Sequence, residues 1–229
     1  MRKAVEVLAD RFPLSRSNRF RRVVGAKPRG ELVWLGSPTA GRMIVDGLLD
    51  SESVCYCGGV GEDISFDLEL IERYGCEVYA FDPTPTGVQH VEAVAPDPER
   101  FHFLPVGLWS SDTTRTFAPL SPGADNWSTT RAADGTAVSA PCRSLSSLMH
   151  EHGHTRIDLL KLDVEGAEYD VLDAMLADDL EVRILCVEFH KDPSIDPMSS
   201  MTRRLAAAGY DAFHVDGFDV GYVRSPGAP

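Results

Sequence analysis

The chain has 229 residues, of which 43% are hydrophobic and 25% are charged, the proportions of an ordinary globular protein. This length suits one α/β domain with modest additions and is enough to bury a proper core. The net charge of −13 is unevenly distributed, because the first thirty residues carry nine bases and two acids while the remaining 199 carry 13 bases and 33 acids. An acidic body argues against a nucleic-acid-binding face, so we expect no nucleic-acid partner.

Hydropathy and cysteine usage indicate a soluble, reduced protein. No run approaches the roughly 18 apolar residues of a membrane span, and residues 1–12 lack the apolar core of a signal peptide. The five cysteines are an odd number and are scattered, which is not typical of a disulfide framework. We therefore expect a cytoplasmic protein without a membrane partner. The sequence does not set its oligomeric state, and a dimer is compatible with it.

Residues 1–50 are predicted to form a basic helical extension or lid, packed on a catalytic domain of residues 51–229. A first helix, followed by a solvated basic loop, is indicated by apolar residues at helical spacing, namely Val5, Leu8 and Phe12. An apolar stretch at 32–35 then precedes a predicted short helix that ends near residue 49. The extension either covers one face of the domain or acts as an arm over the active site.

Residues 54–106 show a regular alternation of strand and helix patterns. This alternation is the signature of a parallel sheet whose strands are joined by crossover helices. The predicted strands are 54–57, 77–81 and 101–106, and the predicted helices are 64–74, which ends at Gly75, and 87–94.

The second half of the chain begins with an irregular segment, 107–139, which is typical of a functional loop or a hairpin excursion. Two short pieces of it, 114–117 and 136–140, read as strands. Beyond it we predict buried strands at 157–162 and 182–189, helices at 145–152, 167–176 and 198–208, and a closing antiparallel pair at 210–215 and 220–223.

A glycine cluster follows the first core strand, as in nucleotide-binding βαβ units. The third glycine of a dinucleotide motif is absent, and Glu62 and Asp63 would repel a diphosphate. These acids suit S-adenosylmethionine, which carries an ammonium and a sulfonium and no phosphate. Asp82, which ends the second strand, can accept hydrogen bonds from the ribose hydroxyls. The alternative is a tight turn in an α/β domain that binds no ligand.

Ligands of doubly wound sheets bind at the carboxyl ends of the strands. The predicted cofactor contacts at these ends are Gly58, Gly59, Gly61, Glu62, Asp63, Asp82, Pro83, Val106, Gly107 and Asp163. Trp127, in the irregular segment, either stacks on the adenine, forms part of the acceptor wall, or anchors its loop.

The segment 157–172, IDLLKLDVEGAEYDVL, resembles the FkbM family of S-adenosylmethionine-dependent methyltransferases, whose hallmark is a strand running into K-[IL]-D-[VI]-E-G-x-E. The stretches GVGEDISFD and AFDPTP are similar to one subgroup of that family. The more common form of the first motif begins with an acid and has glycine two residues later, and this chain has Cys55 and Cys57 at those two places. The resemblance implies a class I methyltransferase fold, Rossmann-like and doubly wound, with a mostly parallel seven-stranded sheet and an antiparallel last strand. It also implies O-methylation of a small-molecule hydroxyl on a sugar, polyketide or other natural product.

Ionisable residues end the fourth and fifth predicted strands. An alcohol must lose its proton as the new C–O bond forms, and His190 suits the role of base, with Asp163 or Glu188 orienting it. A Lys161–Glu188 ion pair across adjacent strands is the purely structural alternative for those two residues.

The same edge offers a second interpretation. Asp163, Glu165, Glu188 and His190 are oxygen and imidazole donors that suit Mg²⁺ or Mn²⁺, although we do not expect a metal to be required. The segment 150–154, HEHGH, resembles a metal cluster at first sight, but a solvated loop is favoured there. Cys55 and Cys57 lack a second cysteine pair, so strand packing is favoured over zinc.

Other functions remain compatible with this scaffold. N- or carboxyl-methylation would use the same fold with another acceptor atom. From a different class, the chain could be a nucleotide-dependent oxidoreductase or a non-catalytic binding module.

Overall fold

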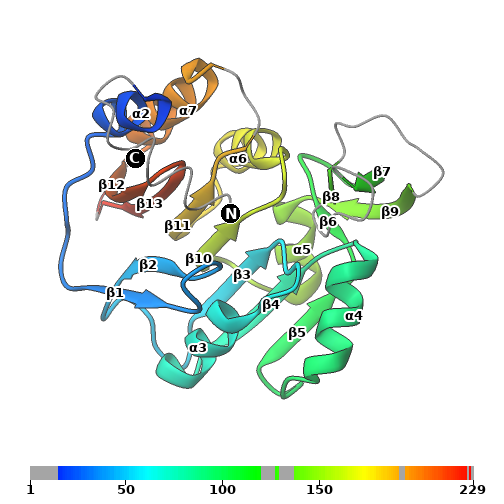
Figure 1. The fold of residues 1–229 in the computed structure, drawn as a ribbon. Coiled ribbons are helices and arrows are strands. Elements are labelled where there is room, and N and C mark those ends of the chain that lie inside the picture. Colours follow the sequence, from blue (N-terminus) through cyan, green and yellow to red (C-terminus); the bar gives the residue numbers. More distant parts are fainter. Residues whose placement is uncertain (1–14, 120–126, 129–136, 191–193, 226, 228–229) are drawn as a thin grey trace.

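The computed structural model describes residues 15–119, 127–128, 137–190, 194–225 and 227, and its centre is a seven-stranded sheet (Figure 1). In spatial order its strands are β12 (Tyr210–Asp216), β13 (Asp219–Arg224), β11 (Val182–Glu188), β10 (Ile157–Leu162), β3 (Val54–Gly58), β4 (Glu77–Phe81) and β5 (Phe101–Leu104). The strands from β11 to β5 are parallel, and β13 runs antiparallel to both of its neighbours. The predicted doubly wound sheet with an antiparallel last strand is confirmed.

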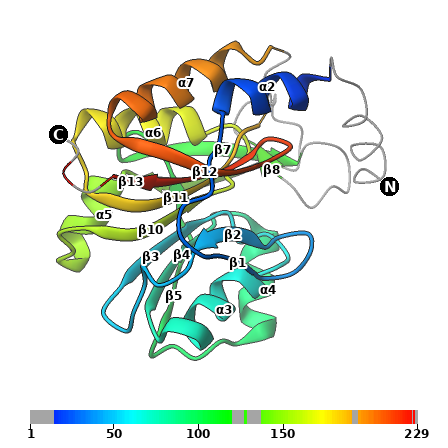
Figure 2. The ribbon, with the colours of Figure 1, turned by 90° about the vertical axis from the view of Figure 1, so that its left-hand side faces the viewer.

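Two layers cover the sheet, one on each face (Figure 2). The covering elements are α2 (Arg16–Val24), β1 (Leu32–Leu35), β2 (Arg42–Val45), α3 (Ser65–Tyr74), α4 (Pro85–Val94), α5 (Leu145–His152), α6 (Glu168–Ala177) and α7 (Asp196–Ala207). Helices α2, α5, α6 and α7 bury apolar side chains on the face to which Tyr56 points. The β1–β2 hairpin, α3 and α4 pack on the opposite face with Cys55 and Cys57, because successive strand residues alternate between faces.

The β1–β2 hairpin replaces the short helix expected before residue 49. Its strands pair antiparallel, with Leu32 opposite Val45 and Leu35 opposite Arg42. The turn needs glycine at position 41, where a Cβ would lie 2.4 Å from the Leu35 carbonyl oxygen. The residues of β2, Arg-Met-Ile-Val, read equally well as a short strand, and packing of β2 on β11 and β13 decides between the two structures. The hairpin thereby reaches the carboxyl edge of the sheet.

Helix α2 occupies residues that were expected to form a solvated basic loop. Ser15 caps it by accepting a hydrogen bond from the Asn18 N–H, and Gly25 ends it in the left-handed conformation. Its one buried side chain, Phe20, meets the Phe189 ring edge to face at 5.9 Å. The helix expected from Val5, Leu8 and Phe12 lies outside the described residues.

The irregular segment after β5 contains a small sheet beside the carboxyl ends of β3 and β4. In spatial order it consists of β6 (Gly107–Leu108), β9 (Val138–Arg143), β7 (Thr113–Pro119) and β8 (Trp127–Ser128). The two strand-like pieces expected in this segment correspond to β7 and β9, so the hairpin excursion is confirmed. Residue 136, where the second piece was expected to begin, is outside the described residues.

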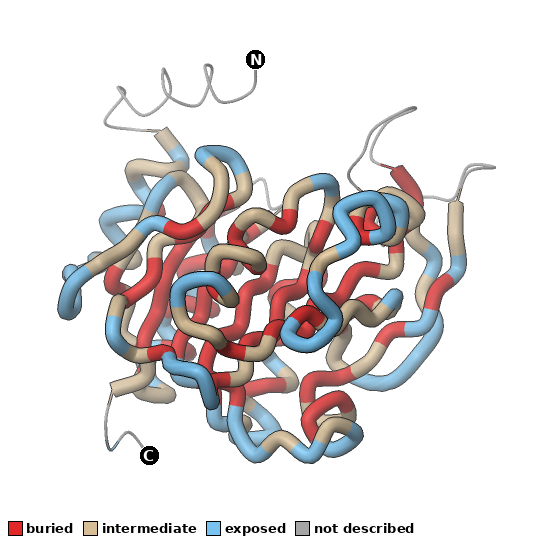
Figure 3. Tube along the Cα trace, turned by 90° about the horizontal axis from the view of Figure 1, so that it is seen from below, coloured by how far each residue is buried: buried red, intermediate tan, exposed pale blue. Residues whose placement is uncertain are grey.

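Strand order reverses between β3 and β10. The chain runs outward from β3 through β4 to β5, then returns to β10 on the other side of β3. In a doubly wound sheet this reversal opens a crevice at the carboxyl ends of the two strands. Burial is densest along these central strands, and exposed residues lie at the periphery (Figure 3). Within the described part of the chain, no helix combines the length and apolarity needed to cross a membrane.

Candidate cofactor and acceptor site

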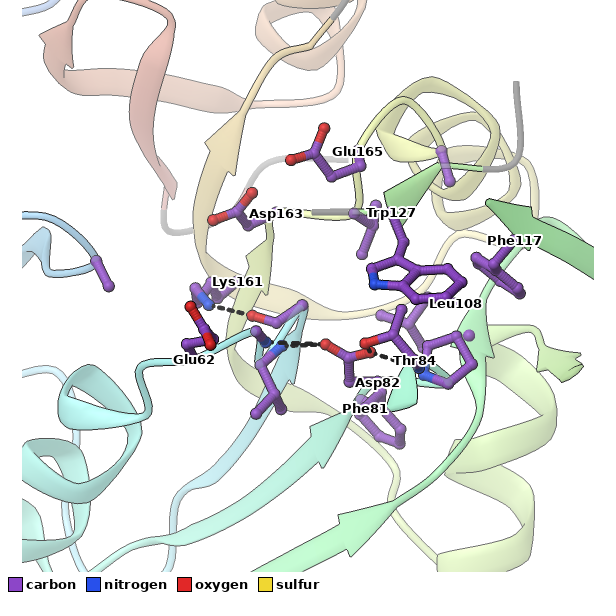
Figure 4. A pocket seen from close by; sticks show the side chains of 18 of the residues that line it. Glu62, Phe81, Asp82, Thr84, Leu108, Phe117, Trp127, Lys161, Asp163 and Glu165 are labelled. Carbon is purple, nitrogen blue, oxygen red and sulfur yellow. Dashed lines mark hydrogen bonds between the residues drawn. The ribbon is translucent and has the colours of Figure 1, made fainter. Parts of the chain in front are cut away.

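A cavity with a volume of about 290 Å³ lies in this crevice (Figure 4). Its walls come from the loop after β3, the end of β4, the small sheet, and the loop after β10. Eight of the predicted cofactor contacts line it: Gly59, Gly61, Glu62, Asp63, Asp82, Pro83, Gly107 and Asp163. Gly58 and Val106 do not line it. The space that a Gly58 side chain would need is filled by Leu108, whose Cδ1 would lie 2.7 Å from an added Cβ.

The glycine loop after β3 is held tightly against the end of β10. A Cβ on Gly59 would lie 1.8 Å from the Asp163 carbonyl oxygen, and the residue has φ +84°. Its own carbonyl accepts a hydrogen bond of 2.7 Å from Lys161 Nζ. Glycine is therefore required here by the approach of two loops to each other. Gly61 also has a positive φ, +54°, but open space where a Cβ would be.

Asp82 braces this loop with both carboxylate oxygens. Oδ2 accepts hydrogen bonds from the N–H groups of Val60 and Gly61, at 3.0 and 2.9 Å. Oδ1 accepts from the Thr84 N–H at 2.8 Å and its hydroxyl at 2.6 Å. With four acceptor positions occupied, Asp82 would contact a ribose hydroxyl only by exchanging one of these bonds.

The side of the cavity next to the small sheet is apolar and aromatic. Trp127 and Phe117 stand over the cavity opposite Asp82 (Figure 4). The Trp127 indole N–H donates to Thr86 Oγ1 at 3.3 Å. An aromatic face beside a carboxylate-braced loop suits a flat heterocycle such as adenine. Asp63, by contrast, is turned toward the hairpin, where it accepts a hydrogen bond of 2.6 Å from the Ser37 hydroxyl.

Arg42, at the start of β2, lies at the centre of the carboxyl edge, a role that the sequence did not reveal. It is buried, with 7% of its side chain exposed, and its Nη2 lies 2.9 Å from Asp163 Oδ2 and 2.7 Å from Glu188 Oε2. Its Nε lies 3.5 Å from Asp219 Oδ1. The Lys161–Glu188 ion pair considered as an alternative is wrong, because the guanidinium occupies the position next to Glu188 while Lys161 binds the glycine loop.

His190 follows β11 and is surrounded by carboxylates. Its Nδ1 forms a 2.8 Å hydrogen bond with Glu168 Oε1. Its Nε2 lies 3.5 Å from Glu188 Oε1, 3.8 Å from Asp163 Oδ1 and 4.0 Å from Glu165 Oε2. The sequence predicted the convergence of His190, Asp163 and Glu188, but assigned the orienting role to Asp163 or Glu188. The close partner is Glu168, the last acid of the KLDVEGAE segment.

Glu168 is fixed by the turn that precedes α6. Its side chain is fully buried and accepts hydrogen bonds from the N–H groups of Val164 and Gly166. The turn includes Glu165 at φ +51° and Gly166 at φ +108°. A buried carboxylate needs hydrogen-bonding partners, and Glu168 has them in the turn and in His190. Glu168 thereby links the turn to the imidazole and fixes the position of both.

Proximity of these groups shifts their pKa values in different directions. Burial, together with repulsion from Glu188, raises the pKa of Asp163. Burial acts on Glu188 as well, but His190 and Arg42 outweigh it and lower the pKa of Glu188 to about 2. Burial would lower the pKa of His190, yet Glu168 and Glu188 raise it to about 11. The imidazole therefore carries a proton at neutral pH.

Of the three histidines of the HEHGH segment, His150 is exposed, whereas His152 and His154 differ from the solvated loop that was favoured. His152 and His154 are half-buried and stack on each other at 5.8 Å between ring centroids. Both contact the Tyr79 ring, and His154 Nδ1 forms a 2.8 Å hydrogen bond with the Tyr56 hydroxyl. These rings pack together on the face of the sheet to which Tyr56 points.

Comparison with known proteins gives consistent matches. A family model described as the methyltransferase FkbM domain matches residues 57–212. The human protein "Probable methyltransferase-like protein 24" is 29% identical over 138 residues, 59% of this chain and 32% of the relative, and the protein of that name from Rattus norvegicus is 30% identical over the same length and shares. The chain thus spans about a third of the length of the curated relatives it matches. The crystal structure of methyltransferase FkbM from Methylobacillus flagellatus KT superposes with a TM-score of 0.50 at 16% identity, covering 78% of this chain and 45% of that one.

Proposed function

The chain belongs to the FkbM methyltransferase family, as its KLDVEGAE segment indicated, and has the Rossmann-like class I fold; from this we propose that it transfers a methyl group from S-adenosylmethionine to a hydroxyl of a small molecule. The cofactor, when bound, supplies an electrophilic methyl group. The chain's own residues must hold the cofactor, align the acceptor oxygen and take up the acceptor's proton.

The observation that carries this proposal is the charge of the cavity. Among the residues that the structure describes, five acids line it, namely Glu62, Asp63, Asp82, Asp163 and Glu165, against one base, Lys161, which is tied to the Gly59 carbonyl. A dinucleotide would bring a diphosphate to this acidic wall at a Coulombic cost. S-adenosylmethionine would bring an ammonium and a sulfonium, which the acids attract. The adenine would lie against Trp127 and Phe117, and the ribose near Asp82 and the loop that it braces.

We assign the acceptor to the end of the cavity at Asp163. This carboxyl lines the cavity, and its raised pKa brings it closer to that of an effective general base. His190 was expected to be the base. While its carboxylate neighbours keep its pKa near 11, it holds a proton and supports Asp163 and Glu188 as a cation. The preference for a hydroxyl over a nitrogen or carboxyl acceptor comes from the family resemblance.

Ligand-dependent thermal unfolding tests the cofactor assignment. S-adenosylhomocysteine at about 100 times its Kd should stabilise the fold by roughly 2.7 kcal/mol, which is about 5–10 °C in Tm for a chain of this size. NAD at the same concentration should give no shift. A shift with NAD and none with S-adenosylhomocysteine would replace the methyltransferase by an oxidoreductase. Transfer of a labelled methyl group to a panel of hydroxyl acceptors, with matched amines and carboxylic acids, then tests the acceptor atom.

A further inference from the structure

The atoms that face one another across the cluster at the ends of β10 and β11 are arranged as ligands. Asp163 and Glu188 each give one oxygen, Oδ2 and Oε2, to the guanidinium of Arg42. The other oxygen of each, Oδ1 and Oε1, faces His190 Nε2, at 3.8 and 3.5 Å. These separations are too long for good hydrogen bonds. Ligands about 2.1 Å from a common cation lie about 3.0 Å apart when adjacent in an octahedron and about 3.4 Å apart in a tetrahedron.

The imidazole is held as metal-binding histidines are held. His190 Nδ1 is hydrogen-bonded to Glu168 Oε1 at 2.8 Å. The other ring nitrogen, Nε2, therefore faces Asp163 Oδ1 and Glu188 Oε1. Histidine ligands of metals characteristically donate the other ring N–H to a carboxylate, which fixes the tautomer and the ring orientation. Glu168 is itself buried and anchored by two backbone N–H groups. Both the facing atoms and their supports are therefore organised before any ligand arrives.

The excess of carboxyl groups in the cluster also favours a bound cation. Asp163, Glu188 and Glu168 surround one imidazole, while Asp219 and Arg42 complete the group. In the described residues these four carboxyls are in contact with one guanidinium and one imidazole. A divalent cation would place its positive charge at the point where the carboxylate oxygens converge. Figure 4 shows the Asp163 and Glu165 side chains projecting to the same side of the loop after β10, where Glu165 extends the set of donors.

We propose that Asp163, Glu188 and His190 bind one divalent cation of the Mn²⁺ type. The three ligating atoms lie within 4.8 Å of one another. A set of two carboxylates and one imidazole suits Mn²⁺ and related borderline ions better than Ca²⁺, which takes oxygen ligands only. The site borders the cavity at Asp163, so a cation there would be placed to bind an acceptor hydroxyl and lower its pKa. His190 and Asp163 are then ligands, and the general-base role given to Asp163 above applies to the protein without the cation. Cation binding itself does not depend on the proposed methyl transfer.

Mn²⁺ is the probe for this site, because its free and bound forms differ in electron paramagnetic resonance. Chelator-treated full-length protein should bind one Mn²⁺ per chain, with spin-echo modulation from a directly coordinated nitrogen. His190→Gln should remove the modulation and weaken binding at least about tenfold. Glu168→Gln should weaken Mn²⁺ binding by about 10–100-fold, as loss of a histidine's supporting carboxylate does. His154→Gln, in the other histidine cluster, should bind Mn²⁺ like the wild type.

Two results would overturn the proposal. One is the absence of Mn²⁺ binding below millimolar concentration in wild-type protein that still binds S-adenosylhomocysteine, which would leave the proposed function standing. The other is nitrogen modulation that persists in His190→Gln, because the site would then lie elsewhere. If His190→Gln does not fold, Glu188→Gln takes its place, and unchanged Mn²⁺ affinity in that variant would be equally decisive against the site. Failure of wild-type protein to bind S-adenosylhomocysteine would instead count against the cofactor assignment.

Discussion

Replacement of Arg42 by glutamine is expected to be among the most destabilising single changes at the carboxyl edge. The guanidinium is buried and contacts Asp163, Glu188 and Asp219. Removal of one partner from a buried ion pair leaves uncompensated charge and costs roughly 3–5 kcal/mol. The three carboxylates retain some contact with water, so we take the lower end, about 3 kcal/mol. At 2–4 °C per kcal/mol for a chain of this size, Tm should fall by about 6–12 °C.

Urea unfolding followed by circular dichroism measures this loss, and Arg73→Gln supplies the control. Arg73 also pairs with a carboxylate, Asp46, but 44% of its side chain is exposed. Exposed pairs contribute about 0–1 kcal/mol. The reasoning is refuted if Arg42→Gln and Arg73→Gln lose the same stability, or if Arg42→Gln lies within 1 kcal/mol of the wild type. Arg42→Lys should recover only part of the loss, because an ammonium cannot reproduce the planar fork of the guanidinium.

Three further changes probe other parts of the structure. Gly59→Ala should abolish S-adenosylhomocysteine binding in calorimetry, because its Cβ would lie 1.8 Å from the Asp163 carbonyl oxygen; binding within twofold of the wild type would contradict this. Trp127→Ala should weaken the same binding by about 1–2 kcal/mol, roughly 5–30-fold, through loss of an aromatic wall; Trp127→Phe should retain most of it. Burial and the neighbouring His152 lower the pKa of His154. The contribution of His154 to the free energy of unfolding is therefore present above about pH 6.5 and is lost as the pH falls further. His154→Gln should therefore flatten the fall in urea midpoint between about pH 6.5 and 5, and an unchanged slope would exclude His154 as its cause.

Apolar patterns and turn residues in the sequence predicted the strands and helices whose formation depends on residues close together in the chain. The β3–α3–β4 unit follows from two short continuous apolar runs, from the period-3.6 pattern between them, and from Gly75, which ends α3 in the left-handed conformation. The carboxyl ends of parallel strands share one edge, so the meeting of Asp163, Glu188 and His190 could be inferred from strand ends alone.

Contacts between distant segments could not be predicted in this way. Arg42 lies 121 residues before Asp163 and 146 before Glu188, and no spacing in the sequence relates them. Burial requires a cation between the two carboxylates, and the sequence offered Lys161 as the nearest one. The role of Glu168 was also missed, although it ends the most informative motif in the chain. The signal in the sequence was an acid two residues after Gly166, on the first turn of the predicted helix.

The position of Arg42 indicates that the folded domain includes residues that precede the family match. The family model starts at residue 57, after the hairpin, yet Leu35 and Ile44 are fully buried in the core and Arg42 joins three strand ends. A lid that opens and closes would have to break these contacts in each cycle, at the cost of exposing a buried guanidinium and two buried apolar side chains. The β1–β2 hairpin is therefore better understood as a fixed part of the domain than as a moving lid.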